Sequence, residues 1–265
     1  MNTQHGFANV NNTRLYYEVA GDGQPLVLIH GFTLDRRMWD HQFEAFAHHY
    51  QVVRYDGRGF GRSALPTAEP YDYADDLKAL LDYLGIAHAH IIGLSLGGGV
   101  AIDFALAYPR MTDTLIPVDS ILGGYRWRHE FGDSLRTLYS LHDAQAATAL
   151  WLNDPLFAPA NAQPVVGAKL AEIVNEFSGW HWVNNNPWRQ PEPPAIERLA
   201  EITAPTLVVI GERDLSDFHA IAGILQERIR GARLAVIPGA GHMANMEAPE
   251  AFNKLVLDFL SGRKA

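Results

Sequence analysis

Residues 90–98 read His-Ile-Ile-Gly-Leu-Ser-Leu-Gly-Gly, a β-branched run that enters a Gly-x-Ser-x-Gly motif, and this stretch decides the fold. A helical pattern begins directly after Ser95, and a serine on such a tight strand-to-helix turn projects its hydroxyl above a sheet. Glycine is needed at 93 and 97 because side chains there would collide with the neighbouring strand and helix. The alternative is a plain turn of a nucleotide-binding fold, but Gly-x-Gly-x-x-Gly and the P-loop lysine are missing. The stretch therefore predicts a serine nucleophile.

Short apolar runs alternate with helical stretches on both sides of this motif. The expected strands are 15–19, 26–30, 51–55, 90–92, 114–118, 206–210 and 233–237, and the expected helices are 71–84, 96–108, 218–229 and 249–260. Alternating strands and helices form a mostly parallel sheet with helices on both faces. The chain is therefore expected to adopt an α/β fold whose active site lies at the carboxyl edge of the sheet.

Residues 121–200 interrupt the alternation. No strand is evident there, and the segment holds five of the six tryptophans of the chain. Prolines cluster in residues 187–194, which suits an exposed connection that returns to the main domain. We therefore expect a core in two parts, 1–120 and 201–265, with a helical cap at 121–200 folded over the carboxyl edge of the sheet.

Composition excludes several classes of protein. The chain has 265 residues, 48% of them apolar, and no cysteine, which rules out disulfides, thiolate metal sites and a cysteine nucleophile. The formal net charge is −9 without a basic stripe, which argues against nucleic acid or an anionic membrane as a partner. The first residues lack the basic and apolar regions of a signal peptide, so we expect a cytoplasmic protein. Self-association into a homodimer is left open.

A serine hydroxyl needs a base, and the base needs a carboxylate that orients it. His242 lies in a glycine-rich loop after the last expected strand, and Asp214 follows the strand 206–210. Both loops end at the same sheet edge as Ser95, in the chain order serine, aspartate, histidine. Asp119 also follows a strand at this edge and is the rival carboxylate. The expected catalytic residues are therefore Ser95, Asp214 and His242.

Acyl transfer places negative charge on a carbonyl oxygen, which backbone N–H groups stabilise. The N–H of Leu96 stands at a helix N-terminus beside the serine. The loop after the strand 26–30 offers a second N–H, that of Phe32, because Gly31 lets the backbone turn inward. We expect these two amides to form an oxyanion hole, with His30 as a structural hydrogen-bonding residue in the same loop.

These motifs together resemble those of the α/β-hydrolase superfamily. They are His30-Gly31-Phe32, residues 56–63, Gly93-Leu94-Ser95-Leu96-Gly97-Gly98, Gly211-Glu212-Arg213-Asp214 and Gly239-Ala240-Gly241-His242. Within the superfamily the chain looks most like small esterases and 3-oxoadipate enol-lactonase-like proteins. Ser95 stands where haloalkane dehalogenases and epoxide hydrolases have aspartate, which counts against those activities.

The aromatic residues of the expected cap suggest a substrate pocket above Ser95. The candidates are Tyr125, Trp127, Trp151, Trp180, Trp182 and Trp188. The alternative is that they form the core of a small helical subdomain. His129 or His181 is a candidate for a polar contact to substrate.

The expected function is hydrolysis of a carboxylic ester or lactone through an acyl-enzyme on Ser95. Water releases the acyl group, so no cofactor or metal is expected. The same constellation also serves carbon–carbon bond hydrolysis and peracid formation. A ligand receptor that retains the three residues but turns over slowly is the alternative from another class.

Overall fold

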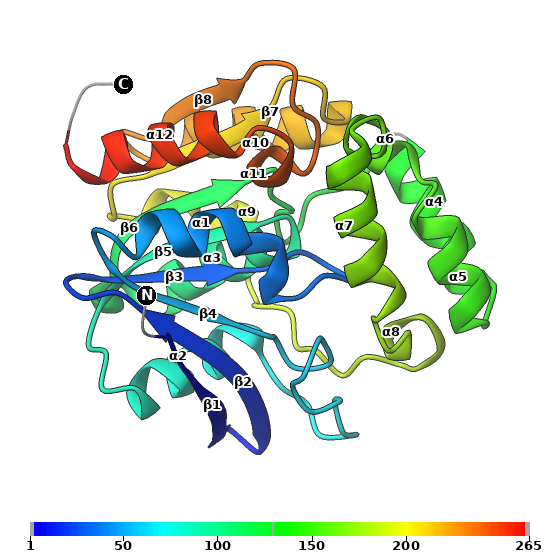
Figure 1. The fold of residues 1–265 in the computed structure, drawn as a ribbon, viewed down its shortest axis with the longest axis horizontal. Coiled ribbons are helices and arrows are strands. Elements are labelled where there is room, and N and C mark those ends of the chain that lie inside the picture. Colours follow the sequence, from blue (N-terminus) through cyan, green and yellow to red (C-terminus); the bar gives the residue numbers. More distant parts are fainter. Residues whose placement is uncertain (1–2, 129, 263–265) are drawn as a thin grey trace.

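One twisted, mostly parallel sheet organises the molecule. The computed structural model describes residues 3–128 and 130–262 (Figure 1). Within them the strands are β1 (Thr3–Val10), β2 (Thr13–Ala20), β3 (Pro25–Ile29), β4 (Gln51–Tyr55), β5 (Ala89–Leu94), β6 (Thr112–Val118), β7 (Leu207–Gly211) and β8 (Arg233–Ile237). Their order is β1-β2-β4-β3-β5-β6-β7-β8. β1 and β2 are antiparallel to their neighbours, and β4, β3, β5, β6, β7 and β8 run parallel.

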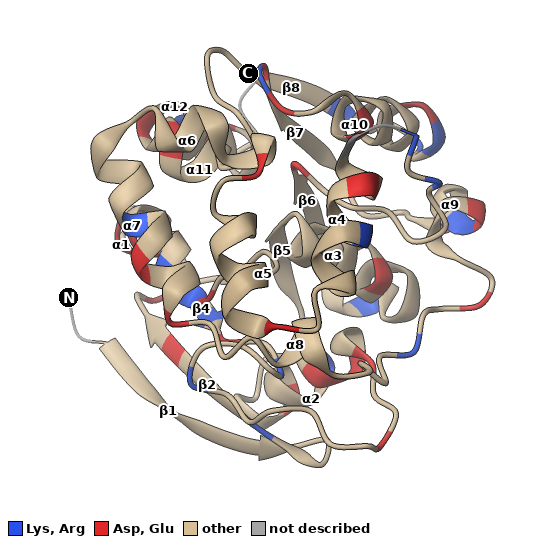
Figure 2. Cartoon of the chain, turned by 90° about the vertical axis from the view of Figure 1, so that its right-hand side faces the viewer, with Lys and Arg blue, Asp and Glu red and all other residues tan. Residues whose placement is uncertain are grey.

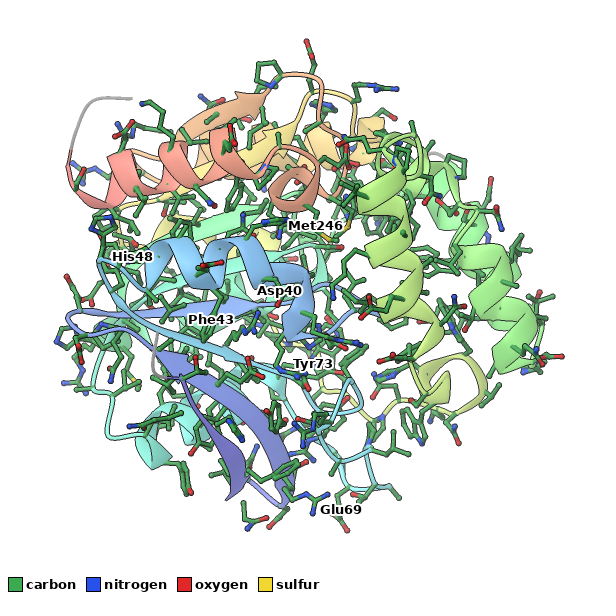
Figure 3. All side chains as sticks on the ribbon, in the orientation of Figure 1. Asp40, Phe43, His48, Glu69, Tyr73 and Met246 are labelled. Atoms are coloured by element: carbon green, nitrogen blue, oxygen red, sulfur yellow. The ribbon has the colours of Figure 1, made fainter. Side chains whose placement is uncertain are left out.

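Helices cover both faces of this sheet. The core helices are α1 (Asp40–Phe46), α2 (Tyr73–Tyr83), α3 (Leu96–Ala107), α9 (Ala195–Arg198), α10 (Ser216–Arg228), α11 (Ala244–Glu247) and α12 (Pro249–Leu260). In Figure 1, α1 and α12 lie in front of the sheet and α2 and α3 lie behind it. Phe43 of α1, labelled in Figure 3, is buried in the core. This layered arrangement is the α/β fold that the alternating pattern predicts.

The central strands are buried on both faces, which explains their sequence. Every residue of β5 is buried, and Leu26, Val27 and Leu28 of β3 have no exposed surface. A strand covered by helices on both sides reads as a continuous apolar run rather than an alternating one. The expected strands 26–30, 51–55 and 233–237 coincide with β3, β4 and β8 to within one residue.

Four core elements were not expected from the sequence, namely β1, α1, α9 and α11, and the last two have only 4 residues each. β1 is the edge strand and pairs only with β2, and most of its residues are exposed or half-buried. A strand at an exposed edge does not need alternating apolar residues, so the sequence of β1 gives little indication of a strand. α1 has only 7 residues, too few for a clear helical period.

Short helices fill the chain between β6 and β7. They are α4 (Glu130–Ser140), α5 (Ala144–Trp151), α6 (Ala158–Asn161), α7 (Pro164–Asn175) and α8 (Trp180–Val183), and they lie together beside one end of the sheet (Figure 1). The sequence marks where two of these helices begin. The Asp143 side chain accepts hydrogen bonds from two N–H groups in the first turn of α5, and Pro164 is the first residue of α7. Among the described residues, no helix has the length and apolar character needed to cross a membrane.

Candidate active site

Ser95 occupies a strained turn between β5 and α3. Its backbone has φ 56° and ψ −115°, outside the regions that non-glycine residues favour. A Cβ at Gly93 would lie 2.0 Å from the carbonyl oxygen of Gly97, and a Cβ at Gly97 would lie 2.2 Å from that of Ile29. Close contact between β3, β5 and α3 therefore requires both glycines, and the turn places Ser95 on the wall of a cavity.

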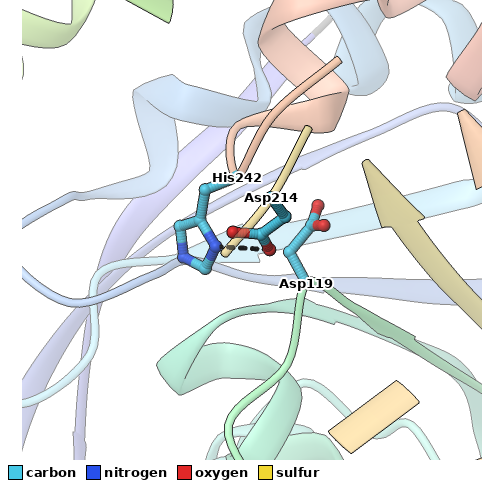
Figure 4. Close-up of side chains that lie close together, drawn as sticks. All are labelled: Asp119, Asp214 and His242. Carbon is cyan, nitrogen blue, oxygen red and sulfur yellow. Dashed lines mark hydrogen bonds and ion pairs between the residues drawn. The ribbon is translucent and has the colours of Figure 1, made fainter. Parts of the chain in front are cut away.

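A buried hydrogen bond between a histidine and an aspartate joins two loops at the same sheet edge. The His242 Nδ1 lies 2.9 Å from Asp214 Oδ2, and the two side chains are 2% and 0% exposed (Figure 4). Because an ionised carboxylate only accepts hydrogen bonds, Nδ1 carries the proton and Nε2 keeps a free lone pair. The Phe218 ring packs on the imidazole with centroids 4.4 Å apart. His242 lines the same cavity as Ser95.

Glu247 of α11 holds the loop that carries His242. Its carboxylate accepts hydrogen bonds from the N–H groups of Gly241, at 2.7 Å, and Met243, at 3.0 Å. Burial raises the pKa of the Glu247 carboxyl. Nothing in its local sequence distinguishes Glu247 from a surface glutamate, so its role could not be predicted from the sequence.

Asp119, the rival carboxylate, lies beside this pair but does not contact His242 through a hydrogen bond. It follows β6, is fully buried and has φ 42°. Its Oδ1 accepts the N–H of Gly211 at 2.7 Å. Burial, followed by the negative charge of Asp214, raises the pKa of Asp119 well above its ordinary value. Asp214, and not Asp119, is therefore the carboxylate that is hydrogen-bonded to the imidazole.

Asp119, Asp214 and His242 also form the one group of potential metal ligands found among the described residues. Their ligand atoms lie within 4.8 Å of one another. The Nδ1 lone pair that a metal would need is replaced here by an N–H that donates to Asp214. The donor set therefore fits a hydrogen-bonded charge pair rather than a resident metal ion.

The loop after β3 supplies backbone N–H groups at the cavity. Among the described groups, no protein acceptor binds the N–H of Phe32 or that of Leu96, and both residues line the cavity. The loop is held by His30, whose Nε2 accepts the Gly57 N–H at 2.8 Å while Nδ1 donates to the Gly31 carbonyl at 2.8 Å. Burial lowers the pKa of His30, so its ring is a neutral structural element, as expected.

The cavity has a volume of about 490 Å³ and lies between the sheet edge and the cap helices. Of the predicted pocket residues, Trp127, Trp151 and Trp188 line it. Side chains that the sequence analysis did not single out complete the wall, namely Leu34, Tyr73, Ile121, Phe131, Leu135, Tyr139, Leu156, Phe157, Asn184, Asn185, Asn186 and Met243. His181 also lines the cavity, whereas His129 lies outside the described residues.

Three predicted pocket residues do not line the cavity, which corrects the expectation for them. Tyr125 instead donates its hydroxyl hydrogen to Asp217 at 2.7 Å. Trp182 packs behind the wall, edge-on to the Phe32 ring at a centroid distance of 5.0 Å. Trp180 is half-buried and meets the ring of the cavity-lining His181 edge-on, at a centroid distance of 5.1 Å. These rings support the wall of the cavity or lie outside it.

A parallel sheet with a serine on a strained turn, and a buried histidine–aspartate pair at the same edge, defines the class of α/β hydrolases. The chain belongs to the alpha/beta hydrolase family, whose model matches residues 26–255. Family membership and the names of its relatives support hydrolase activity.

Several relatives match over nearly the whole chain. The "Putative carbamate hydrolase RutD" of Caulobacter sp. (strain K31) is 32% identical and covers 95% of this chain and 97% of its own. The "2-hydroxy-6-oxononadienedioate/2-hydroxy-6-oxononatrienedioate hydrolase" of Comamonas testosteroni is 28% identical, over 95% of this chain and 93% of its own. The enol-lactonase structure from Burkholderia xenovorans LB400 is 26% identical, has a TM-score of 0.81 and covers 97% of this chain and 100% of its own.

Proposed function

We propose that the protein is a serine hydrolase that cleaves a carboxylic ester or lactone through an acyl-enzyme on Ser95. The observation that carries this proposal is the buried His242–Asp214 pair, which opens onto the same cavity as a serine held at positive φ. Residues 121–200 supply the cap that closes this cavity through α4 to α8, whereas α9 at the end of this range packs against α3 of the core. A cytoplasmic location and a homodimer stay predictions.

The reaction follows from the roles of these groups. Ser95 Oγ attacks the carbonyl carbon while His242 Nε2 takes its proton, and Asp214 stabilises the imidazolium. The N–H groups of Phe32 and Leu96 hold the oxyanion, each worth roughly 3 kcal/mol. The imidazolium then gives its proton to the departing alcohol. Water attacks the acyl-enzyme by the same route and releases the acid.

The cavity favours an ester or lactone over the carbon–carbon bond substrates of some relatives. The Comamonas testosteroni relative is named for hydrolysis of a dioate, a substrate with two carboxylates. Carboxylates that leave water need a cation or several donors. None of the described residues lining this cavity is Lys or Arg.

A carbamate is the second candidate substrate. The 32% identity to a relative named for carbamate hydrolysis supports it. A carbamate carbonyl would use the same nucleophile, base and oxyanion groups, so the catalytic assignment is unchanged.

Labelling with a fluorophosphonate tests the nucleophile. We expect one adduct, mapped by mass spectrometry to Ser95, with loss of aryl-ester turnover in proportion to labelling. A panel of aryl esters, lactones and aryl carbamates then ranks the substrates by kcat/KM. An adduct on another residue of active protein, or tight binding of esters with negligible turnover, would contradict the proposal.

A further inference from the structure

The wall of the cavity carries no formal charge. None of the described residues that line it is Lys, Arg, Asp or Glu. Its two histidines are His242 and His181, and burial lowers the pKa of His181 to about 4, so this ring is neutral at pH 7. Figure 2, which faces the cap, shows α5 without any acidic or basic residue.

Two arginines of the core, Arg58 and Arg37, are already held by carboxylates. Arg58 forms an ion pair with Asp76 at 2.7 Å, and the two side chains are 3% and 1% exposed. Arg37 binds Asp35, also at 2.7 Å. Moving either guanidinium toward a ligand would leave a buried carboxylate without its partner. Neither of these two guanidinium groups is therefore free to bind a substrate, and none of the described residues that line the cavity supplies a cation.

Neutral polar groups gather at one part of the cavity wall. Asn184 and Asn185 are exposed and Asn186 is half-buried, which places this triplet at the mouth. Asn186 Oδ1 accepts the hydroxyl hydrogen of Tyr71 at 2.8 Å, and Asn184 Nδ2 donates to the Trp180 carbonyl at 2.9 Å. Amides both donate and accept without charge, so this rim can bind a neutral polar group.

We propose that the substrate is uncharged, with an apolar body inside the cavity and a neutral hydrogen-bonding group at the asparagine rim. This inference rests on the proposed function and names its substrate class. A carboxylate in the same place would lose its hydration and find no cation. A carboxamide of the same shape would keep hydrogen bonds with the rim at little cost.

Two matched substrates test the inference. One is the 4-nitrophenyl monoester of heptanedioic acid, which ends in a carboxylate, and the other is its ω-carboxamide. We expect kcat/KM at pH 7 to be at least about 100-fold higher for the carboxamide, since the two differ in charge but hardly in shape. Equal kcat/KM values for the two esters would overturn the inference.

A new charge in the wall sharpens this test. Leu135 is a half-buried lining residue. Leu135→Arg should narrow the preference for the carboxamide by about tenfold or more, whereas the uncharged control Leu135→Met should leave it unchanged. A preference that the arginine does not alter would show that shape, and not charge, governs the choice.

Calorimetric binding separates this inference from the proposed function. The affinities of heptanamide and of heptanoate for the unmodified protein are measured without any reaction taking place. If neither ester is turned over and Ser95 is not labelled, the proposed function fails, and tighter binding of heptanamide still supports a cavity for neutral ligands. Equal binding of heptanoate would overturn the inference whatever the catalytic result.

A second inference concerns Asp119 and rests on a different observation. Its Oδ1 accepts the Gly211 N–H, but its buried Oδ2 meets no donor among the described groups. The carboxylate of Asp214 lies beside it, and the other ionisable groups that face it are Glu247 and His242. Two adjacent buried carboxyl groups cannot both be ionised at modest cost, and Asp214 is the partner of the imidazole.

We infer that Asp119 keeps its proton on Oδ2 and donates it to the Asp214 carboxylate, which turns the other oxygen of Asp214 toward His242. Asp119 is then a positioning residue that acts through Asp214. It resembles an amide in its hydrogen bonds, with one accepting oxygen and one donor.

Two substitutions test this role at a backbone with positive φ. Asn and Gly both tolerate that conformation, but only Asn keeps an acceptor and a donor. Asp119→Gly should lower kcat/KM by about 30-fold, and Asp119→Asn should restore at least about tenfold of that loss. Equal losses in the two variants would contradict the inference.

The pH profile tests whether Asp119 is protonated or ionised in the active protein. If Asp119 were ionised, Asp119→Asn would remove a negative charge beside His242 and move the acidic limb of kcat/KM to lower pH. With Asp119 protonated, the limb stays where it is in the parent protein. Infrared spectroscopy provides a direct check, because the band of a protonated carboxyl should be present in the parent and missing in Asp119→Asn.

Discussion

The cavity has a core side and a cap side, and different forces hold them. The core side comprises Gly31, Phe32, Ser95, Leu96 and His242, and the cap side comprises Trp127, Phe131, Leu135, Trp151, Phe157 and Trp188. Strand ends and backbone hydrogen bonds fix the core side. The cap side is built from aromatic rings in edge-on and tilted contacts, such as Phe131 with Trp151 at 6.2 Å between centroids.

This difference indicates which side of the cavity governs the reaction and which side governs the choice of substrate. Reacting groups need positions fixed to a fraction of an ångström, which strand ends and short turns provide. Ring packing tolerates exchange of one apolar side chain for another with smaller consequences. Changes on the core side should therefore alter kcat steeply, and changes on the cap side should mainly alter which substrate is accepted.

The largest effect is expected from Ser95→Ala. Because the proposed nucleophile is lost, kcat for aryl esters should fall by about 10⁴-fold or more. The fold should be retained, as judged by circular dichroism and by the thermal unfolding curve. A variant that keeps more than about one per cent of the parent kcat would show that the serine does not form the acyl-enzyme.

The next effect concerns the stability of the core domain, which carries the core side of the cavity. Asp103 of α3 is buried, and burial, followed by the charge of Asp72, raises its pKa to about 7 from an ordinary value of 3.8. The folded state therefore binds this proton more tightly than the unfolded state. Its stabilising contribution is complete below about pH 4 and is lost as pH rises through about 7.

Asp103→Asn removes this titration. The difference in free energy of unfolding between the variant and the parent should favour the variant more at pH 8 than at pH 5, by about 2–3 kcal/mol. Urea denaturation at both pH values measures it. If the difference in free energy of unfolding does not change with pH, the pKa of Asp103 is not raised in the folded protein.

A smaller effect should appear where the two sides meet. Trp151 Nε1 on the cap donates to Thr33 Oγ1 on the loop after β3 at 2.8 Å. Removing either partner, with Trp151→Phe or Thr33→Val, should lower kcat/KM by about fivefold, since a net hydrogen bond contributes about 1 kcal/mol. The double variant should lose little more than either single one. Fully additive losses would show that this bond does not couple the cap to the loop.

The smallest effect is expected at Trp180. Because Trp180 does not line the cavity, Trp180→Ala should change kcat/KM by about twofold or less, whereas Trp127→Ala at the cavity wall should change the ranking of acyl groups. Substrate panels for both variants measure this. A large loss in Trp180→Ala would place that ring closer to the substrate than its position indicates.

Much of the core could be predicted because its elements carry strong local signals. Buried parallel strands read as apolar runs, and the turn at Ser95 needs glycine on both sides. Loops that follow parallel strands meet at one edge, which is why Asp214 and His242 could be paired across 28 positions. Asp119 also follows a strand at that edge, and the coordinates show that Asp214, the residue favoured from the sequence, is the one hydrogen-bonded to His242.

The cap could be recognised as helical but not resolved into cavity-lining and supporting residues. α6 and α8 have 4 residues each, so no helical period shows which side of them faces the core. Trp182 and Trp188 look alike in sequence, yet only Trp188 lines the cavity. The asparagine rim was missed because a polar triplet in a loop carries no signal of a nearby cavity.

Three residues around the cavity hold the backbone at positive φ without being glycine: Thr33 at 62°, Ser95 at 56° and Asp119 at 42°. They directly follow or lie near the ends of β3, β5 and β6. Each such conformation costs of the order of 1–3 kcal/mol, which the surrounding structure must supply. Glycine would relieve this strain, but at Thr33 and Asp119 it would remove the oxygens that accept hydrogen bonds from Trp151 and Gly211, and at Ser95 it would remove the proposed nucleophile. Thermal stability and catalytic turnover therefore place opposing demands on these three strained residues.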